Sequence, residues 1–307
     1  MGIFSRLRAW LHAWSAPPES SAPPTPPAPL PAVDSRDCGL VDAVMRGWYQ
    51  NDSGELLRGF VLGPEDTVLD FGCGEGGAAL FAARQGSTVI FADVEADKIA
   101  ALETRMQQTG ARACRGIVCG DLSTGERLPL ADASVNRIIA MEVLEHVPDP
   151  ARVMAELVRI ATPGAQFLIS VPDPAGELIQ QAVAPAAHFQ PPNHIHIFER
   201  ADFTRLIEAA GLHIEQRHHS GFYWSLWMGL YWATQPAAHA NHRATRDATR
   251  DAITPPYPPL LDQWAATWRT LLDTPQGAAL QTALDDLMPK SQTLIARKPF
   301  SSPPADT

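Results

Sequence analysis

The feature that most limits what this chain can fold into is a glycine-rich turn set between a strand and a helix. Gly72-Cys73-Gly74-Glu75-Gly76-Gly77 has the spacing G-x-G-x-x-G. The run at 67–71 predicts a buried strand before it, and residues 76–85 favour a helix after it. Glycines there let the backbone bend sharply and approach a ligand, because no Cβ stands in the way. The turn predicts an α/β fold with a ligand at this point, and the alternative is a turn that binds nothing.

The rest of the sequence alternates between strand-like and helical stretches from about Asp34 onward. Further strands are expected at 87–92, 116–119, 135–140, 166–171, 213–214 and 293–296. Helices are expected at 96–108, 151–160 and 200–210. This alternation is typical of a mostly parallel sheet with helices on both faces.

Two segments interrupt this pattern and suggest how the chain is divided. Residues 1–33 combine an amphipathic N-terminal helix with a linker that holds eight prolines between residues 15 and 33. Residues 221–290 are rich in Leu and Trp, which favours a helical insertion over disorder. The main domain is therefore expected at 34–220, and the last strand and a tail at 291–307.

Apolar residues in two places bear on where the protein works. The N-terminus and the stretch 222–232 are both rich in large apolar side chains, but no apolar run is long enough for a membrane-spanning helix. A basic amphipathic N-terminus can lie in a membrane interface or dock on a protein, or be a frayed helix with no role. The stretch 222–232 either packs on the sheet edge or forms a lid and interfacial surface for an apolar, lipid-like ligand. Peripheral membrane contact through both segments is one hypothesis.

Composition excludes some partners and suggests a compartment. The formal net charge is −10, so an extended phosphate-binding surface, and with it nucleic acid, is not expected. The four cysteines lack a metal-ligand spacing such as C-x-x-C. Reduced thiols in a cytoplasmic protein are the simplest interpretation.

Three acids at the ends of consecutive strands suggest which ligand the turn binds. Asp70 lies directly before the glycines, where it would repel a pyrophosphate but accept a hydrogen bond from a cationic amino group. Asp93 ends the second strand and can accept both ribose hydroxyls. Asp121 follows the third strand and suits an adenine amino group. Each alone could be an ordinary loop or cap residue, but together they outline one ligand in the crevice that such sheets use.

Longer motifs resemble those of class I S-adenosylmethionine-dependent methyltransferases. Val68 to Gly76 looks like the first motif of that class, and the sequence MEVLEHVPDP at 141–150 is similar to the segment after strand four in the ubiquinone-biosynthesis O-methyltransferase branch. The stretches 192–198 and 294–299 resemble the branch's segment after strand five and its closing strand. The resemblance covers about Glu65 to His219 and the C-terminal strand.

This resemblance implies a Rossmann-like sheet of seven strands and a set of cofactor contacts. The strand order would be 3-2-1-4-5-7-6 with strand seven antiparallel, and the insertion would lie between strands six and seven. The cofactor, S-adenosyl-L-methionine, would have three parts held by different residues: the methionine part by Asp70, Gly72 and Gly74, the ribose by Asp93, and the adenine by Asp121 and Leu122. Phe71, Cys73 and Val94 complete the predicted set, and Glu142 would line the pocket near the reacting methyl group.

The acceptor needs residues that can take a proton. Transfer from the sulfonium to an oxygen or nitrogen is an in-line displacement, in which the protein mainly aligns the groups and removes that proton. Candidates are Glu142, Glu145 and His146 on one side and His194 and His196 on the other. Capping of backbone groups is the alternative role for the segment around His146.

In the quinone branch, residues matching Glu142, Glu145 and His146 are implicated in binding a divalent metal, and no metal is assigned here. The predicted function is methylation of a small-molecule or lipid-like acceptor, more often at oxygen than at carbon or nitrogen. A non-catalytic scaffold with the same fold and an NAD(P)-dependent oxidoreductase are the alternatives. Asp70 and the 141–150 segment argue against the oxidoreductase.

Overall fold

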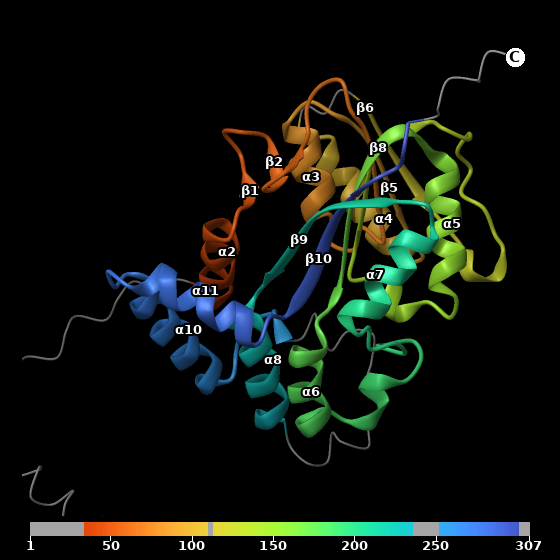
Figure 1. Ribbon diagram of the computed structural model, residues 1–307. Coiled ribbons are helices and arrows are strands. Elements are labelled where there is room, and N and C mark those ends of the chain that lie inside the picture. Colours follow the sequence, from red (N-terminus) through yellow and green to blue (C-terminus); the bar gives the residue numbers. More distant parts are fainter. Residues whose placement is uncertain (1–33, 110–112, 236–251, 301–307) are drawn as a thin grey trace, which may run out of the picture. The chain divides into compact units, whose positions relative to one another are not determined.

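Seven strands form the central sheet of the computed structural model, which describes residues 34–109, 113–235 and 252–300 (Figure 1). In chain order they are β4 (Thr67–Phe71), β5 (Thr88–Asp93), β6 (Ala113–Val118), β7 (Val135–Met141), β8 (Ala161–Pro172), β9 (His213–Ser220) and β10 (Ser291–Arg297). Their order across the sheet is β6-β5-β4-β7-β8-β10-β9. Only β10 runs antiparallel to its neighbours β8 and β9. The predicted order 3-2-1-4-5-7-6 with an antiparallel seventh strand is confirmed.

Alternating side chains of the strands bury both faces of this sheet. In β7, Ile138 and Ala140 belong to one buried cluster, whereas Ile139 belongs to the other. This follows from the two-residue period of a strand, and it explains why strands covered on both faces are apolar throughout. One face is covered by α5 (Pro150–Ile160) and α7 (Arg200–Ala209), the other by α3 (Gly77–Arg84) and α4 (Ala96–Met106).

A third apolar cluster joins helices that are distant in the sequence. It contains side chains of α2 (Ser35–Met45), α8 (Phe222–Thr234) and α10 (Pro259–Leu272), and α11 (Gly277–Leu287) packs nearby. Tyr223, Trp227 and Trp268 are fully buried in it. Figure 1 shows these helices gathered at one end of the sheet. The chain returns from them at Ser291, which pairs with Pro172 at the carboxyl end of β8. The insertion therefore lies at the carboxyl edge of the parallel strands.

Some elements were not predicted from the sequence. These are α2, α6 (Pro174–Val183) and a small antiparallel sheet of β1 (Trp48–Gln50), β2 (Glu55–Leu57) and β3 (Phe60–Val61). Strands of two or three residues are too short to show an alternating pattern. The proposed helix and linker at 1–33, residues 236–251 of the insertion and the tail after residue 300 lie outside the described residues.

Within the described ranges, no helix is both long and apolar enough to cross a membrane. The large side chains of the stretch 222–232 mostly contribute to the third cluster, since Tyr223, Trp227 and Tyr231 are buried. Packing, the first of the two interpretations of this stretch, therefore accounts for most of its aromatic residues.

Candidate active site

A cavity of about 800 Å³ opens at the carboxyl ends of β4, β5 and β7. All the predicted cofactor residues line it: Asp70, Phe71, Gly72, Cys73, Gly74, Asp93, Val94, Asp121, Leu122 and Glu142. His146 lines it as well, but His194 and His196 do not. The structure thus brings together residues at the ends of four strands, β4, β5, β6 and β7, that are separated in the sequence, as expected for the crevice of a parallel sheet.

Asp70 is a buried carboxyl that faces both the cavity and a helix. Its Oδ2 accepts a hydrogen bond of 3.0 Å from the backbone N–H of Ala79, in the first turn of α3. Burial raises the pKa of Asp70 to about 7, the Ala79 N–H opposes this, and Asp93 adds to it. A cationic ligand next to this carboxyl would favour its ionised form.

The glycine turn is held by the end of β5. The N–H groups of Gly72 and Cys73 donate to the carbonyl of Ala92 at 2.8 and 3.0 Å, and the N–H of Gly74 donates to Asp93 Oδ2 at 3.0 Å. Gly72 has a φ of +68°, and a Cβ there would stand 2.3 Å from a methyl carbon of Val143. Gly74 has a φ of +49°, and a Cβ there would meet no atom closer than 4.0 Å. Position 72 therefore requires glycine, because a Cβ would collide with Val143 and the backbone is left-handed. At position 74 a side chain would instead occupy part of the cavity.

The two acids after β5 and β6 are also oriented by backbone groups. Asp93 uses its second oxygen, Oδ1, to accept from the N–H of Glu95 at 3.0 Å. Asp121 accepts from the N–H of Ser123 at 2.9 Å and so caps the short 3-10 helix η1 (Leu122–Thr124). The capping role that was the alternative for such acids is thus present, and both residues also line the cavity. A carboxylate oxygen has two acceptor sites, so capping leaves further capacity for a ligand.

Glu142 follows β7 in a strained conformation and pairs with a residue from the far end of the chain. Its φ is +55°, a left-handed conformation that costs a non-glycine residue about 1–3 kcal/mol and is concentrated at functional sites. Its Oε2 pairs with Lys290 Nζ, and its Oε1 accepts from Ser170 Oγ at 3.1 Å. Burial opposes ionisation, but the ammonium of Lys290 together with Ser291 holds the pKa of Glu142 below its ordinary value. Glu142 is therefore a carboxylate at neutral pH.

His146 presents a neutral imidazole to the cavity. It ends the 3-10 helix η2 (Leu144–His146), and its Nδ1 lies 3.3 Å from the carbonyl of Pro192. That carbonyl favours the tautomer with the proton on Nδ1, which leaves the lone pair on Nε2. Burial, reinforced by His194, lowers the pKa of His146. An unprotonated ring nitrogen beside the cavity can accept a proton.

His194 and His196 have partners behind the cavity wall. His194 Nδ1 is 3.0 Å from Glu177 Oε2, and its ring meets that of His146 edge-on, with centroids 5.0 Å apart. His196 Nε2 is 3.0 Å from the carbonyl of Val147. Of these three histidines, His146 alone lines the cavity in the described chain, and the other two contact groups around its loop.

The structure does not bring Glu142, Glu145 and His146, the three residues that the quinone branch implicates in metal binding, together as one set of ligands. Among the described residues, two groups have ligand atoms all within 4.8 Å of one another: Glu145, His146 and His194, and Glu177, His188 and His194. Glu142 belongs to neither group, and its carboxylate pairs with Lys290. The three residues therefore do not fit a common metal ion.

The rest of the cavity wall comes from parts of the chain to which no site role was assigned. Arg36 of α2, Tyr49 of β1, Met228 of α8, Ile253 and Lys290 all line it, and so does Trp224, which lay in the aromatic run considered as a lid. Tyr49 is held close to Asp70: burial and then this carboxyl raise the pKa of its hydroxyl. A Cβ on Gly39 would stand 2.2 Å from the indole of Trp224, so α2 packs directly against this side chain.

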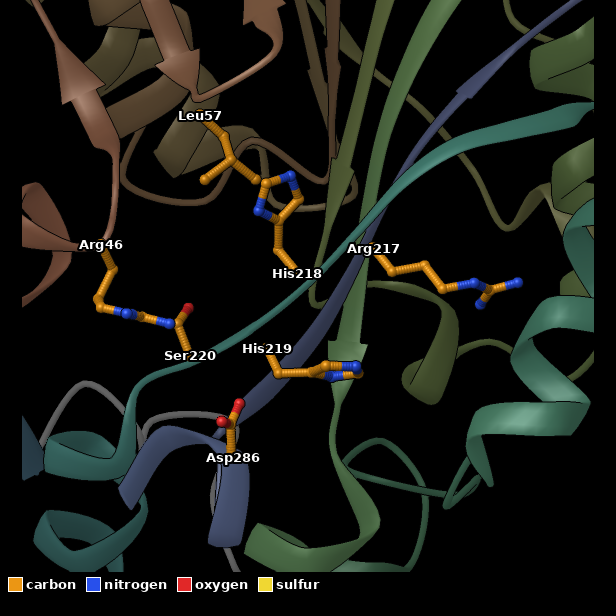
Figure 2. Close-up of a pocket in the computed structure, with 7 residues that line it drawn as sticks. All are labelled: Arg46, Leu57, Arg217, His218, His219, Ser220 and Asp286. Carbon is orange, nitrogen blue, oxygen red and sulfur yellow. The ribbon is translucent and has the colours of Figure 1, made fainter. Parts of the chain in front are cut away.

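A second, smaller pocket of about 190 Å³ lies against the edge strand β9 (Figure 2). Its lining residues are Arg46, Leu57, Arg217, His218, His219, Ser220 and Asp286. Figure 2 shows His218 pointing toward Leu57 and Arg217 pointing away from it. Neighbouring residues of a strand alternate between its faces, so the basic groups of this pocket do not converge on one ligand.

Comparison with known proteins gives a consistent family. The sequence pattern of a family described as a methyltransferase domain matches residues 35–217, more than half of the chain. The chain is 35% identical over 147 residues to the methyltransferase GfsG of Streptomyces halstedii, covering 47% of this chain and 52% of that protein. It is 32% identical over 150 residues to a probable S-adenosylmethionine-dependent methyltransferase of Mycolicibacterium smegmatis, covering 48% and 52%. A ubiquinone biosynthesis O-methyltransferase of Hahella chejuensis is 36% identical over 108 residues, covering 35% and 43%.

The fold and the family match define a methyltransferase domain of class I, the class that depends on S-adenosylmethionine. The chain belongs to the methyltransferase domain family, and S-adenosylmethionine is the cofactor of its class. It spans about half the length of the curated relatives it matches.

The donor groups of this cofactor match the acceptors of the cavity. S-adenosylmethionine carries an ammonium group, two ribose hydroxyls and an adenine amino group, and the cavity offers the carboxyls of Asp70, Asp93 and Asp121. The open space at Gly74 gives the backbone a close approach to such a ligand. The residues present therefore fit the cofactor, and the role of each residue stays a prediction.

Proposed function

We propose that this protein transfers the methyl group of S-adenosylmethionine to a hydroxyl of a small, largely apolar acceptor. The observation that carries the proposal is that one cavity is lined both by Asp70, Asp93 and Asp121 and by Glu142 and His146. Bound there, the cofactor supplies an activated methyl group. The side chains of this chain then hold, orient and deprotonate the acceptor.

The acceptor side favours a molecule with an apolar body and a polar end. Trp224, Met228 and Ile253 offer apolar surface, and Lys290 and His146 offer polar groups deeper in the same cavity. Pockets of this kind bind apolar ligands and fix their orientation with a few polar contacts. The names of ubiquinone O-methyltransferases among the relatives support methylation at oxygen.

His146 is the proposed general base. Its Nε2 carries the lone pair when Pro192 accepts the Nδ1 proton, and burial keeps the ring neutral. In the proposed mechanism, Nε2 would take the acceptor's hydroxyl proton. The cofactor, held by Asp70, Asp93 and Asp121, would supply the methyl group to the acceptor oxygen, and its sulfur would keep the electron pair of the broken S–C bond. The Glu142–Lys290 pair keeps one carboxylate and one ammonium fixed beside the reacting groups.

The first experiment is calorimetric titration of the purified protein with S-adenosylmethionine, S-adenosylhomocysteine and NADH. We expect saturable binding of both sulfur ligands, weakened in Asp93→Ala, and no binding of NADH. Binding of NADH alone would support the oxidoreductase, and a folded protein that binds none of the three would support the scaffold.

A second experiment tests His146 in methyl transfer, with hydroxylated lipids and quinones as acceptors. His146→Gln should lower kcat by roughly 100-fold or more, as for loss of a general base, and leave cofactor affinity within about threefold. The pH profile separates the roles: kcat of the parent should fall on acidification as the ring is protonated, and that of His146→Gln should not. Unchanged kcat in the variant would remove His146 from the chemistry.

We also propose that the protein is cytoplasmic and reaches a membrane-bound acceptor through residues 1–33. The support is the amphipathic, basic sequence of that segment and the four unpaired cysteines. Deleting residues 1–33 should reduce sedimentation with anionic liposomes and leave cofactor binding unchanged. Equal sedimentation of both proteins would contradict the membrane proposal alone.

A further inference from the structure

A cluster of metal-ligating side chains lies behind the cavity wall. Glu177 comes from α6, His188 from the 3-10 helix η3 (Ala186–Phe189), and His194 from the loop that follows. Each offers a ligand atom within 4.8 Å of the others. The rings of His188 and His194 have centroids 4.6 Å apart, and His194 Nδ1 is 3.0 Å from Glu177 Oε2.

Two buried polar groups here lack partners among the described residues. Neither carboxylate oxygen of Glu145 has a hydrogen bond, although this side chain is fully buried. Its nearest basic atom is His146 Nε2 at 3.7 Å. Nε2 of His188 is also without a partner, and only 3% of that residue is exposed. Burying such groups without a partner costs about 1–3 kcal/mol each, so a missing ligand is a physical explanation for both.

The charges around the cluster are unbalanced in the direction that a cation would correct. Glu142, Glu145 and Glu177 all interact with one ammonium, that of Lys290. Buried charges are ordinarily paired or coordinate a metal.

The carboxylate of Glu177 is oriented by further hydrogen bonds. Gln180 Nε2 donates to Glu177 Oε1 at 3.0 Å, and Gln180 Oε1 accepts from Trp232 Nε1 at 3.3 Å. Metal-binding carboxylates are typically fixed by such outer contacts. Since Gln180 is itself buried, this arrangement is built into the packing of α6 against α8.

We propose that Glu177, His188 and His194 form a site for a divalent transition metal ion, next to the unpartnered carboxylate of Glu145, which is grouped with His194 but not with Glu177 or His188. Two imidazoles with a carboxylate suit Zn²⁺ and neighbouring ions such as Co²⁺ better than Mg²⁺, which prefers an all-oxygen shell. This site differs from the trio implied by the quinone branch, because it excludes Glu142 and uses ligands from α6 and η3. The ion would fix the loop that carries Pro192 and Asn193 into the wall of the cavity.

The test uses the full-length protein, stripped with a chelator and titrated with Co²⁺ and Zn²⁺. We expect one equivalent of Co²⁺ to bind with visible d–d absorption and to be displaced by Zn²⁺. His188→Gln and Glu177→Gln should each weaken binding by about 100-fold or more. The exposed residues His213 and Glu208 provide matched controls, and His213→Gln and Glu208→Gln should bind as the parent does.

The competing assignments predict other outcomes. Loss of binding in Glu142→Gln but not in His188→Gln would overturn the proposal in favour of the Glu142 trio. Absence of stoichiometric binding in the folded, chelator-treated parent would also overturn it. Circular dichroism of the metal-free variants checks folding, and the isosteric Glu177→Gln decides if His188→Gln fails to fold. Metal binding is read without methyl transfer, so its failure and that of the proposed function are distinguishable.

Discussion

The two sides of the cavity are built in different ways. On the cofactor side, Asp70, Asp93 and Asp121 end or follow consecutive strands, and backbone N–H groups of their own loops or the next helix fix each carboxyl. On the acceptor side, Trp224 and Lys290 lie in or next to the insertion and reach the cavity from far along the chain. The Glu142–Lys290 pair joins residues 148 positions apart.

This difference indicates which side of the cavity is fixed by the fold itself and which side can vary. The cofactor side is determined by local hydrogen bonds and by the parallel sheet, which brings strand ends to one edge whatever the loops contain. The acceptor side depends on packing within the third apolar cluster. There Tyr223 donates from its hydroxyl to the carbonyl of Ser35 at 2.8 Å, and Trp268 Nε1 donates to the buried Asp42 at 2.8 Å. Substitutions should therefore affect binding of one ligand and not of the other.

The largest effect should come from Gly72→Ala. The variant must keep a φ of +68° and place a Cβ 2.3 Å from Val143, so either the turn or the side chain of Val143 has to move. We expect the Kd for S-adenosylhomocysteine to rise by about 100-fold or more, which corresponds to about 2.7 kcal/mol. Calorimetric titration measures it.

Gly211→Ala is the matched control for that substitution. Gly211 also has a left-handed φ, +83°, and a Cβ there meets no atom within 4 Å. The control therefore carries the conformational cost of alanine without the collision at the turn. An equal loss of affinity in both variants would mean that general destabilisation, and not the turn, sets cofactor binding.

A smaller effect, on binding of the acceptor and not of the cofactor, is expected from Trp224→Ala. The indole lines the acceptor side and packs on Gly39 of α2, so its removal takes away apolar contact with the acceptor. We expect the acceptor's KM to rise by about 10- to 30-fold, equivalent to burial of a partly exposed aromatic ring, with cofactor Kd within about threefold. Steady-state kinetics and calorimetry measure the two quantities. Trp224→Phe should restore part of the loss, and a parallel fall in cofactor affinity would show that the two sides are not independent.

Sequence reasoning succeeded where the signal is local. The seven strands and their order follow from alternation and from the resemblance, and the acids at strand ends meet in one cavity because parallel strands end at one edge. A local signal for α6 was also present. Pro174 stands at its first position, and Asp173 caps it by accepting from the N–H of Ala175.

The acceptor side could not be predicted in the same way. That Trp224 meets Gly39, or that Lys290 meets Glu142, depends on how the whole insertion packs, and no local pattern encodes a contact over such separations. The same holds for Glu177 and His188, which only the fold of α6 and η3 brings to His194. Tyr49 was missed because the strand that carries it has three residues.

The smallest predicted effect is a pH dependence confined to the cofactor side. Burial raises the pKa of Asp70 to about 7 in the free protein, and a cationic amino group binds the ionised carboxylate better than the protonated form. Affinity should therefore be highest above the pKa and fall as the pH is lowered through it. Between pH 7.5 and 6 the ionised fraction of Asp70 falls by roughly eightfold, so the Kd for S-adenosylhomocysteine should rise by about that factor.

Two variants test this pH dependence. Asp70→Asn should bind more weakly at pH 7.5 and lose the dependence, because the amide does not titrate and still offers an oxygen to the N–H of Ala79. Trp224→Ala should keep the full dependence, since the acceptor side contributes no group to it. A pH dependence that persists in Asp70→Asn would place the titrating group elsewhere, and one that disappears in Trp224→Ala would mean that the acceptor side controls the ionisation of the cofactor side.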